Sequence, residues 1–147
     1  MQWNACSLKK HSNELKQYLA TSKSTPDLIC VAETFLKPKH KFFLSGYNII
    51  RKDREGNDPK GGVAILIRSG VQFQNLNLVF NKIEAIAIQI FCKNSKVTIV
   101  NVYDPPDDLV DLEDYRQVFS ISGRVIVTGD FNAHNPLWKS QRMDRRG

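Results

Sequence analysis

Five polar residues of the sequence stand at points where predicted β-strands end. They are Asn4, Glu33, Tyr103, Asp130 and Asn132. Each of them alone has an ordinary structural explanation, such as a cap, a loop residue or a turn aspartate. Together, acid, amide and phenol groups at four strand ends favour a functional site, because α/β and β-sandwich folds place their sites there.

These residue types suit the hydrolysis of a phosphate ester. The Glu33 carboxylate and the Asn4 amide oxygen are hard ligands of the kind that Mg²⁺ takes while it keeps several waters. Such an ion polarises a phosphoryl oxygen and stabilises the leaving alkoxide. Asp130 would orient or deprotonate the attacking water, and Asn132 and Tyr103 would donate hydrogen bonds to phosphate oxygens. The sequence has no glycine-rich phosphate loop, Cys/His dyad or Ser-His-Asp order that competes with this interpretation.

The strands that must position these residues are visible as short apolar runs. Residues 28–32, LICVA, form a continuous apolar run, which is typical of a strand buried on both faces. Residues 83–91 alternate isoleucine with alanine or glutamine, which is the period of two of a strand. Further strands are predicted at 47–51, 63–68, 73–80, 96–103 and 124–128.

Two amphipathic helices accompany the strands. Leucines at helical spacing predict the first over residues 12–22, with Ser12 or Asn13 as its cap. The second follows Pro105-Pro106 and has acids in its first turns, which suit the helix dipole. Its apolar positions are Leu109, Leu112, Tyr115 and Phe119. A strand-rich chain with hairpins and interspersed helices favours two packed sheets flanked by helices over a single parallel sheet.

The composition describes one globular domain. The chain has 147 residues, of which 41% are hydrophobic, and its length predicts a single domain. No apolar run approaches the roughly 18 residues of a membrane span, and the start lacks the hydrophobic segment of a signal peptide. Three cysteines at wide spacings exclude a disulfide scaffold and favour a reducing, intracellular compartment.

The net charge of +6 is unevenly distributed. Residues 1–68 contain 12 basic and 6 acidic residues, whereas residues 69–147 contain 9 of each. A basic surface of this kind is compatible with a polyanionic partner and equally with a solvated protein face.

Five sequence motifs, in order, resemble those of the endonuclease/exonuclease/phosphatase superfamily. They are WNACSL at 3–8, AETFL at 32–36, GY with RKDR and GGVAILIR within 46–68, NVYDPP at 101–106 and GDFNAHNPLW at 129–138. The chain most resembles the apurinic-endonuclease-like domain of LINE-type (non-LTR, jockey-like) retrotransposons, from Gln2 to Gly147.

The resemblance implies an α/β fold of the DNase I-like type, a four-layer α/β/β/α sandwich of two packed mixed sheets. It implies DNA nicking with Mg²⁺, or with Mn²⁺ in its place. Asn4 and Glu33 match metal-site residues, Tyr103 matches a tyrosine that contacts phosphate, and Asp130 and Asn132 match the pair that handles the water and the transition state. We expect Glu33, Tyr103, Asp130 and Asn132 to converge on one cleft, with Asn4 nearby but loosely held.

The family pattern also includes residues that this sequence does not match. A second aspartate and a Ser-Asp-His motif, whose histidine is a general base or electrostatic partner, have no counterpart here. The three histidines are His11, His40 and His134, and we interpret His134, beside the site, as a loop residue. We therefore expect residues 1–147 to be a partial domain that is clipped at its N-terminus, before Asn4, and incomplete at its C-terminus. Such a domain would be weak or inactive alone, with a reverse transcriptase downstream in an intact element.

DNA is the expected partner, with no membrane involved, and the expected location is intracellular, which is compatible with the nucleus. The expected phosphate contacts are Lys37, Lys39, Lys41, Arg51, Lys52, Arg54, Lys139, Arg142, Arg145 and Arg146. Two alternatives remain open. One is a catalytically inactive remnant that binds nucleic acid, which the unmatched Ser-Asp-His motif favours. The other is a phosphatase of the same superfamily, which the residues after GDFN disfavour because they lack the bulky residue and arginine of the phosphoinositide phosphatases.

Overall fold

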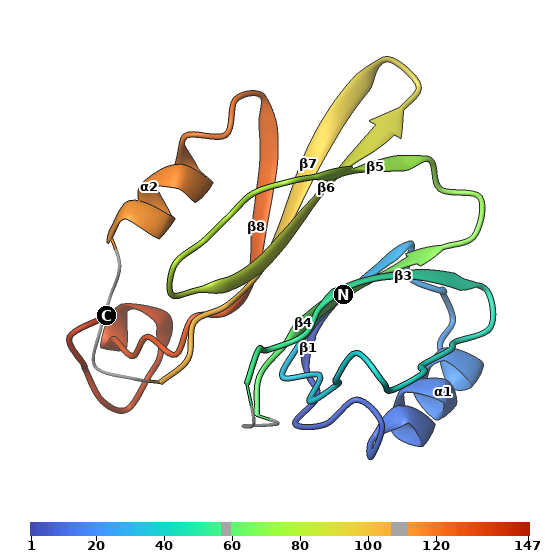
Figure 1. Ribbon diagram of the computed structural model, residues 1–147, viewed down its shortest axis with the longest axis horizontal. Helices are drawn as coiled ribbons and strands as arrows, with labels where there is room; N and C mark the ends of the chain where they lie inside the picture. Colours follow the sequence, from blue (N-terminus) through green and yellow to red (C-terminus); the bar gives the residue numbers. More distant parts are fainter. Residues whose placement is uncertain (57–59, 107–111) are drawn as a thin grey trace.

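Two four-stranded β-sheets pack face to face in the computed structural model, which describes residues 1–56, 60–106 and 112–147 (Figure 1). The first sheet has the order β1-β2-β4-β3, formed by Gln2–Asn4, Leu28–Ala32, Val63–Arg68 and Tyr47–Lys52. The second has the order β5-β6-β7-β8, formed by Phe73–Leu76, Glu84–Cys92, Ser95–Tyr103 and Arg124–Asp130. Both sheets are mixed, because β1 runs parallel to β2 and β7 runs parallel to β8 while the other pairs are antiparallel.

The continuous apolar run of β2 follows from its two covered faces. Ile29 and Val31 pack outward in a cluster with Leu15 of helix α1 (Ser12–Thr21). Cys30 points the other way, into the cluster between the sheets that includes Ile65 and Ile88. A strand covered on both sides has no position where a polar side chain reaches water, so the alternation of a half-buried strand is absent.

Helix α2 (Leu112–Phe119) covers the outer face of the second sheet. Val118 packs there with Ala85 and Val100. The buried Asp114 carboxylate accepts hydrogen bonds from the backbone N–H groups of Asn81, Lys82 and Ile83, at 2.8, 2.7 and 3.0 Å. An acid that suits the helix dipole therefore also anchors the segment that leads into β6.

The expected four-layer α/β/β/α sandwich is confirmed by this arrangement. Strands at 28–32 and 63–68 match to the residue, whereas β5 ends at Leu76 rather than continuing to residue 80. The cap of α1 is His11, not Ser12 or Asn13. The Ser12 hydroxyl instead donates to the carbonyl of Lys9. The predicted apolar position at 109 lies outside the described residues.

The three thiols Cys6, Cys30 and Cys92 are free, in agreement with the prediction from their wide spacing in the sequence. Burial raises the pKa of the Cys30 thiol to about 11, so this group stays protonated in the core. Among the described residues, no helix is long and apolar enough to cross a membrane.

Candidate active site

The Asn4 amide joins two carboxylates that come from different sheets. Its Nδ2 donates to Glu33 Oε1 at 2.8 Å and to Asp130 Oδ2 at 2.7 Å. Its Oδ1 accepts from the backbone N–H of Cys6 at 3.1 Å. The expectation that Asn4 is loosely held is therefore wrong, because three hydrogen bonds fix its side chain although β1 has only three residues.

Glu33 reaches Asn4 because β1 and β2 are parallel neighbours. Asn4 is paired with Ala32, so the two strands end at the same level. Backbone bonds continue past the strands: Ser7 N–H donates to the Glu33 carbonyl at 2.9 Å and Leu8 N–H to the Thr34 carbonyl at 2.9 Å. These bonds hold Glu33 at φ 52°, a conformation that is unfavourable for a non-glycine residue and clusters at functional sites.

Asp130 is held from both sides of its carboxylate. Oδ2 accepts from Asn4, and Oδ1 accepts the backbone N–H of Asn132 at 3.1 Å. Asn132 donates through Nδ2 to the Asp104 carbonyl at 2.8 Å, which uses one of its two amide N–H groups. Gly129 precedes the aspartate because a Cβ there would overlap the carbonyl oxygen of Val102 in the neighbouring strand, and its φ is 149°.

Tyr103 lies beside Asp130 in the second sheet. The two residues are partners in the parallel β7–β8 pair, and Tyr103 is almost fully buried against Ala32 and Val63. Burial, and then the negative charge of Glu33, raise its pKa to about 12, with Arg54 opposing them. The phenol is therefore neutral at physiological pH and can donate a hydrogen bond.

The Arg54 guanidinium lies 5.7 Å from the centre of the Tyr103 ring. It forms an ion pair with Glu84, and the second carboxylate oxygen of Glu84 accepts the Gly62 N–H. Glu84 lies outside the sequence motifs, so the sequence alone does not predict it as a site residue. Only its place opposite Tyr103 in the β6–β7 pair puts it at the site.

A cavity of about 720 Å³ opens beside these groups. Asn4, Asp130 and Asn132 line it together with aromatic side chains such as Tyr115 and Trp138. Glu33 and Tyr103 are not among the described residues of its wall. The structure thus brings all five predicted site residues together through hydrogen bonds and strand pairing, but only three of them face this cavity.

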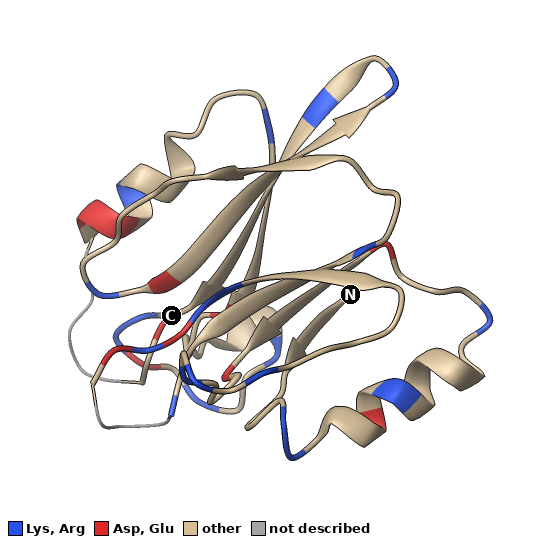
Figure 2. Cartoon of the chain, turned by 45° about the vertical axis from the view of Figure 1, so that its right-hand side comes forward, with Lys and Arg blue, Asp and Glu red and all other residues tan. Residues whose placement is uncertain are grey.

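The arginines expected to contact DNA are largely engaged within the chain. Arg51 pairs with Asp53 at 3.3 Å, and Arg54 pairs with Glu84. Arg146 donates to the Pro105 carbonyl at 2.6 Å. The exposed members of the predicted set are Lys39, Lys41, Lys52, Lys139, Arg142 and Arg145. Figure 2 shows basic segments at the end of the sheets where the C-terminus lies.

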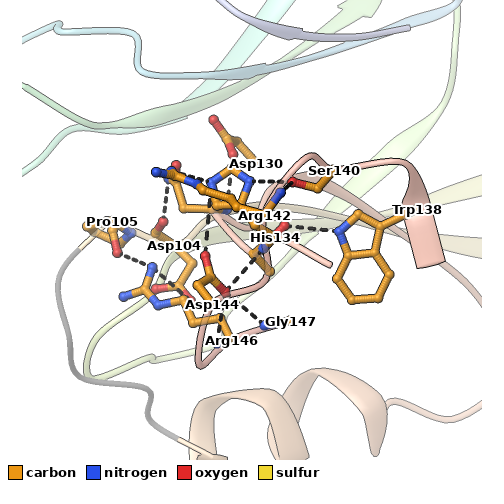
Figure 3. A network of polar contacts seen from close by, with 12 residues as sticks. Asp104, Pro105, Asp130, His134, Trp138, Ser140, Arg142, Asp144, Arg146 and Gly147 are labelled. Atoms are coloured by element: carbon orange, nitrogen blue, oxygen red, sulfur yellow. Dashed lines mark hydrogen bonds and ion pairs between the residues drawn. The ribbon is translucent and has the colours of Figure 1, made fainter. Parts of the chain in front are cut away.

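His134 belongs to a loop network close to Asp130 (Figure 3). Its Nε2 lies 2.8 Å from Arg142 Nη2, and its Nδ1 lies 3.3 Å from Ser140 Oγ. Because a guanidinium can only donate, Nε2 accepts and Nδ1 carries the proton. Asp144 accepts the backbone N–H of His134, which lowers the pKa of this carboxyl. The geometry fits the interpretation of His134 as a loop residue.

Comparison with known proteins agrees with this fold. The model of the endonuclease/exonuclease/phosphatase family matches residues 1–147, and the chain belongs to this family. The predicted resemblance to LINE-type endonuclease domains is confirmed, and by family the chain is of the hydrolase type.

Two of the curated relatives are RNA-directed DNA polymerases, one from a mobile element and one, named as probable, from a transposon. The chain is 28% identical over 147 residues to the RNA-directed DNA polymerase from mobile element jockey of Drosophila melanogaster. It is 25% identical over 148 residues to the probable RNA-directed DNA polymerase from transposon X-element of the same species. In both cases the match covers 99% of this chain and 16% of the relative, so the chain spans a small part of the proteins that it resembles.

Two solved structures share the fold. The endonuclease domain of TRAS1, a telomere-specific non-LTR retrotransposon, has a TM-score of 0.77 and 24% identity, with 99% of this chain and 65% of that chain covered. A 3′-5′ exonuclease from Neisseria meningitidis has a TM-score of 0.60 and 23% identity, with 90% and 57% covered.

Proposed function

We propose that this chain is a metal-dependent phosphodiesterase domain that nicks DNA and acts together with a reverse transcriptase. The observation that carries the proposal is the Asn4 amide held by Glu33 and Asp130 from two sheets, beside the neutral phenol of Tyr103. Family membership and the similarity to retrotransposon polymerases support the substrate class and the partner.

The donor set suits Mg²⁺, with Mn²⁺ as an alternative. Two carboxylates lie within hydrogen-bond distance of one amide, and hard oxygen donors of this kind are what the ion prefers. Among the described residues, no group of three His, Cys, Asp or Glu side chains forms a closed cage, and Mg²⁺ typically binds only one or two carboxylates. Glu33 would hold the ion, which would polarise the phosphoryl oxygen and stabilise the leaving alkoxide. Asn4 Oδ1 accepts the Cys6 N–H with one lone pair, and its second lone pair would be the one to coordinate the ion.

The remaining groups have roles that follow from their positions. Asp130, held by Asn4 and Asn132, orients the attacking water and accepts its proton. Tyr103 donates a hydrogen bond to a phosphate oxygen, and Asn132 donates through its second amide N–H. Exposed lysines and arginines at the same end of the sheets bind the flanking phosphates.

Relaxation of supercoiled plasmid with Mg²⁺ or Mn²⁺ tests the proposal. Only weak nicking is expected of residues 1–147 alone, and Glu33→Ala and Asp130→Ala are expected to abolish it. The matched control is Asp27→Ala, at the opposite end of β2, where an exposed carboxylate pairs with Arg68. Nicking that persists in both site variants would contradict the site. A wild-type chain that binds DNA but does not nick it with either ion would support the inactive, DNA-binding alternative.

A further inference from the structure

Asn101 is a buried amide that joins the two sheets. It lies in β7 and has no exposed surface. Its Nδ2 donates to the carbonyl of Val31 in β2 and to the carbonyl of Ala64 in β4, each at 2.9 Å. Val31 and Ala64 are directly opposite each other in the β2–β4 pair. Both N–H groups of one side chain are thus used on the facing sheet, and three strands are joined.

Stability does not explain this amide. The neighbouring contacts between the sheets are apolar and involve residues such as Ile65, Ile88 and Ile99. Asn101 Oδ1 is buried and has no hydrogen-bond partner among the described residues, which costs free energy. The amide instead fixes the position of one sheet relative to the other. Apolar packing alone tolerates small displacements between the sheets. Two donors that meet two fixed carbonyls set one arrangement of the sheets.

Along each strand, the residues of the Asn101 bridge lie two positions before the residues of the site. Asn101 precedes Tyr103 by two residues on β7, and Val31 precedes Glu33 by two residues along the β2 segment. Asn101 is also paired with Thr128, which precedes Asp130 by two residues on β8. Two residues of a strand span roughly 6.6 Å. The offset between the sheets at this layer therefore decides whether side chains of the next layer meet.

We infer that Asn101 is a positioning residue, whose amide sets the offset between the sheets so that Asn4 and Glu33 meet Asp130. The inference rests on the proposed function only for what the site does. The contact between Asn4 and Asp130 can be measured without any assay of activity. Removal of the donors by Asn101→Leu should let the first sheet move relative to the second and break the contact between Asn4 and Asp130.

The experiment follows the Asn4 side-chain amide by ¹⁵N NMR in the full chain. Its signals are assigned by their loss in Asn4→Ala. In Asn101→Leu we expect them to shift toward the position of a free amide and to lose protection from hydrogen exchange. Mn²⁺ affinity should fall about 10- to 100-fold, the usual effect of removing a group that orients metal ligands. Ile99→Val, which trims an apolar neighbour on the same face of β7, is the matched control and should leave the Asn4 signals unchanged.

Three outcomes would overturn the inference. The first is that the Asn4 signals are unchanged in folded Asn101→Leu. The second is that Ile99→Val shifts them equally. The third applies if the leucine variant does not fold, and is that the Asn4 signals are unchanged in Asn101→Thr. The threonine keeps one donor, so an intermediate shift is expected there. A wild-type chain without nicking whose Asn4 signals still depend on Asn101 would refute the proposed function and support the positioning role.

Discussion

Asn4 and Asp130 are 126 residues apart and belong to different sheets, yet Asn4 Nδ2 lies 2.7 Å from Asp130 Oδ2. The same nitrogen also donates to Glu33, so one neutral amide separates two negative charges. A hydrogen bond to an ionised carboxylate is stronger than one between neutral groups. The amide therefore allows two acids to share a site in the absence of a cation, and several properties of the protein depend on this contact.

Asn4→Asp should destabilise the chain in the absence of divalent ions, because three carboxylates would then meet without a donor between them. We expect a loss of about 1 kcal/mol or less, because Asn4 is exposed and water screens the added charge. Added Mg²⁺ should restore much of the stability, and thermal unfolding with and without MgCl₂ measures both effects. Asn4→Ala is the control, since it removes the donor without adding a charge. Equal responses of the two variants to Mg²⁺ would contradict this prediction.

Tyr103→Phe should reduce nicking by about 10²- to 10³-fold while the fold is kept. This is the usual cost of removing one hydrogen-bond donor from a developing anion. The measurement is a single-turnover rate, accompanied by an unfolding curve that should barely change. Tyr18→Phe, an exposed tyrosine on α1, is the matched control. A rate within threefold of wild type would show that the phenol does not contact the reacting phosphate.

Stability should fall as the pH rises from about 10 to about 12. The pKa of Tyr103 is raised from its ordinary value of 10 to about 12 in the folded chain. In this interval the unfolded chain loses the phenol proton while the folded chain retains it, so the stabilising contribution present below pH 10 is lost. Tyr115 and Tyr47 shift in the same direction, so Tyr103→Phe should remove only part of the slope. Urea unfolding at a series of pH values checks this, and an unchanged slope in Tyr103→Phe would contradict it.

Gly129→Ala should both destabilise the chain and disturb Asp130. The added Cβ would overlap the Val102 carbonyl and occupy a φ of 149°, which other residues rarely adopt. The conformation alone costs about 1–3 kcal/mol. Gly123→Ala is the control that separates strain from overlap, because its φ is also positive, at 90°, and no atom lies within 4 Å of the added Cβ. If urea unfolding gives the same loss for both, the overlap is unimportant.

DNA binding should weaken with salt through the exposed lysines near the site. Each phosphate contact contributes roughly 0.9 to the slope of log affinity against log salt concentration. Lys41→Ala and Lys139→Ala should each reduce the slope by about that amount, as measured by fluorescence anisotropy with a labelled duplex. Lys93→Ala, in the turn between β6 and β7 at the far end of the sheets, should leave it unchanged. A slope that is independent of all three lysines would place the DNA elsewhere.

The sequence by itself determined most of the elements and the residue types of the site. Residues 28–32 and 63–67 are uninterrupted apolar runs, and burial of a strand on both faces produces that pattern. The contact between the motif residues Asp130 and Asn132 is also local in sequence, because the backbone N–H of Asn132 donates to the Asp130 carboxylate two positions earlier. The predicted boundaries of some elements are wrong, such as the end of β5 and the N-cap of α1. At element ends local propensity is weak and tertiary contacts decide.

Only the tertiary structure decided how the site is held together. The Asn4 bridge, the pairing of Arg54 with Glu84 and the Asn101 amide between the sheets all join residues at least 29 positions apart in the chain. No motif marks Glu84, and the NVYDPP motif that begins at Asn101 does not reveal that the Asn101 side chain joins the sheets. A buried polar side chain is specified by its partner and not by a periodic pattern. The prediction that Arg54 contacts DNA also fails to account for a tertiary partner, because Arg54 forms an ion pair with Glu84 of the other sheet.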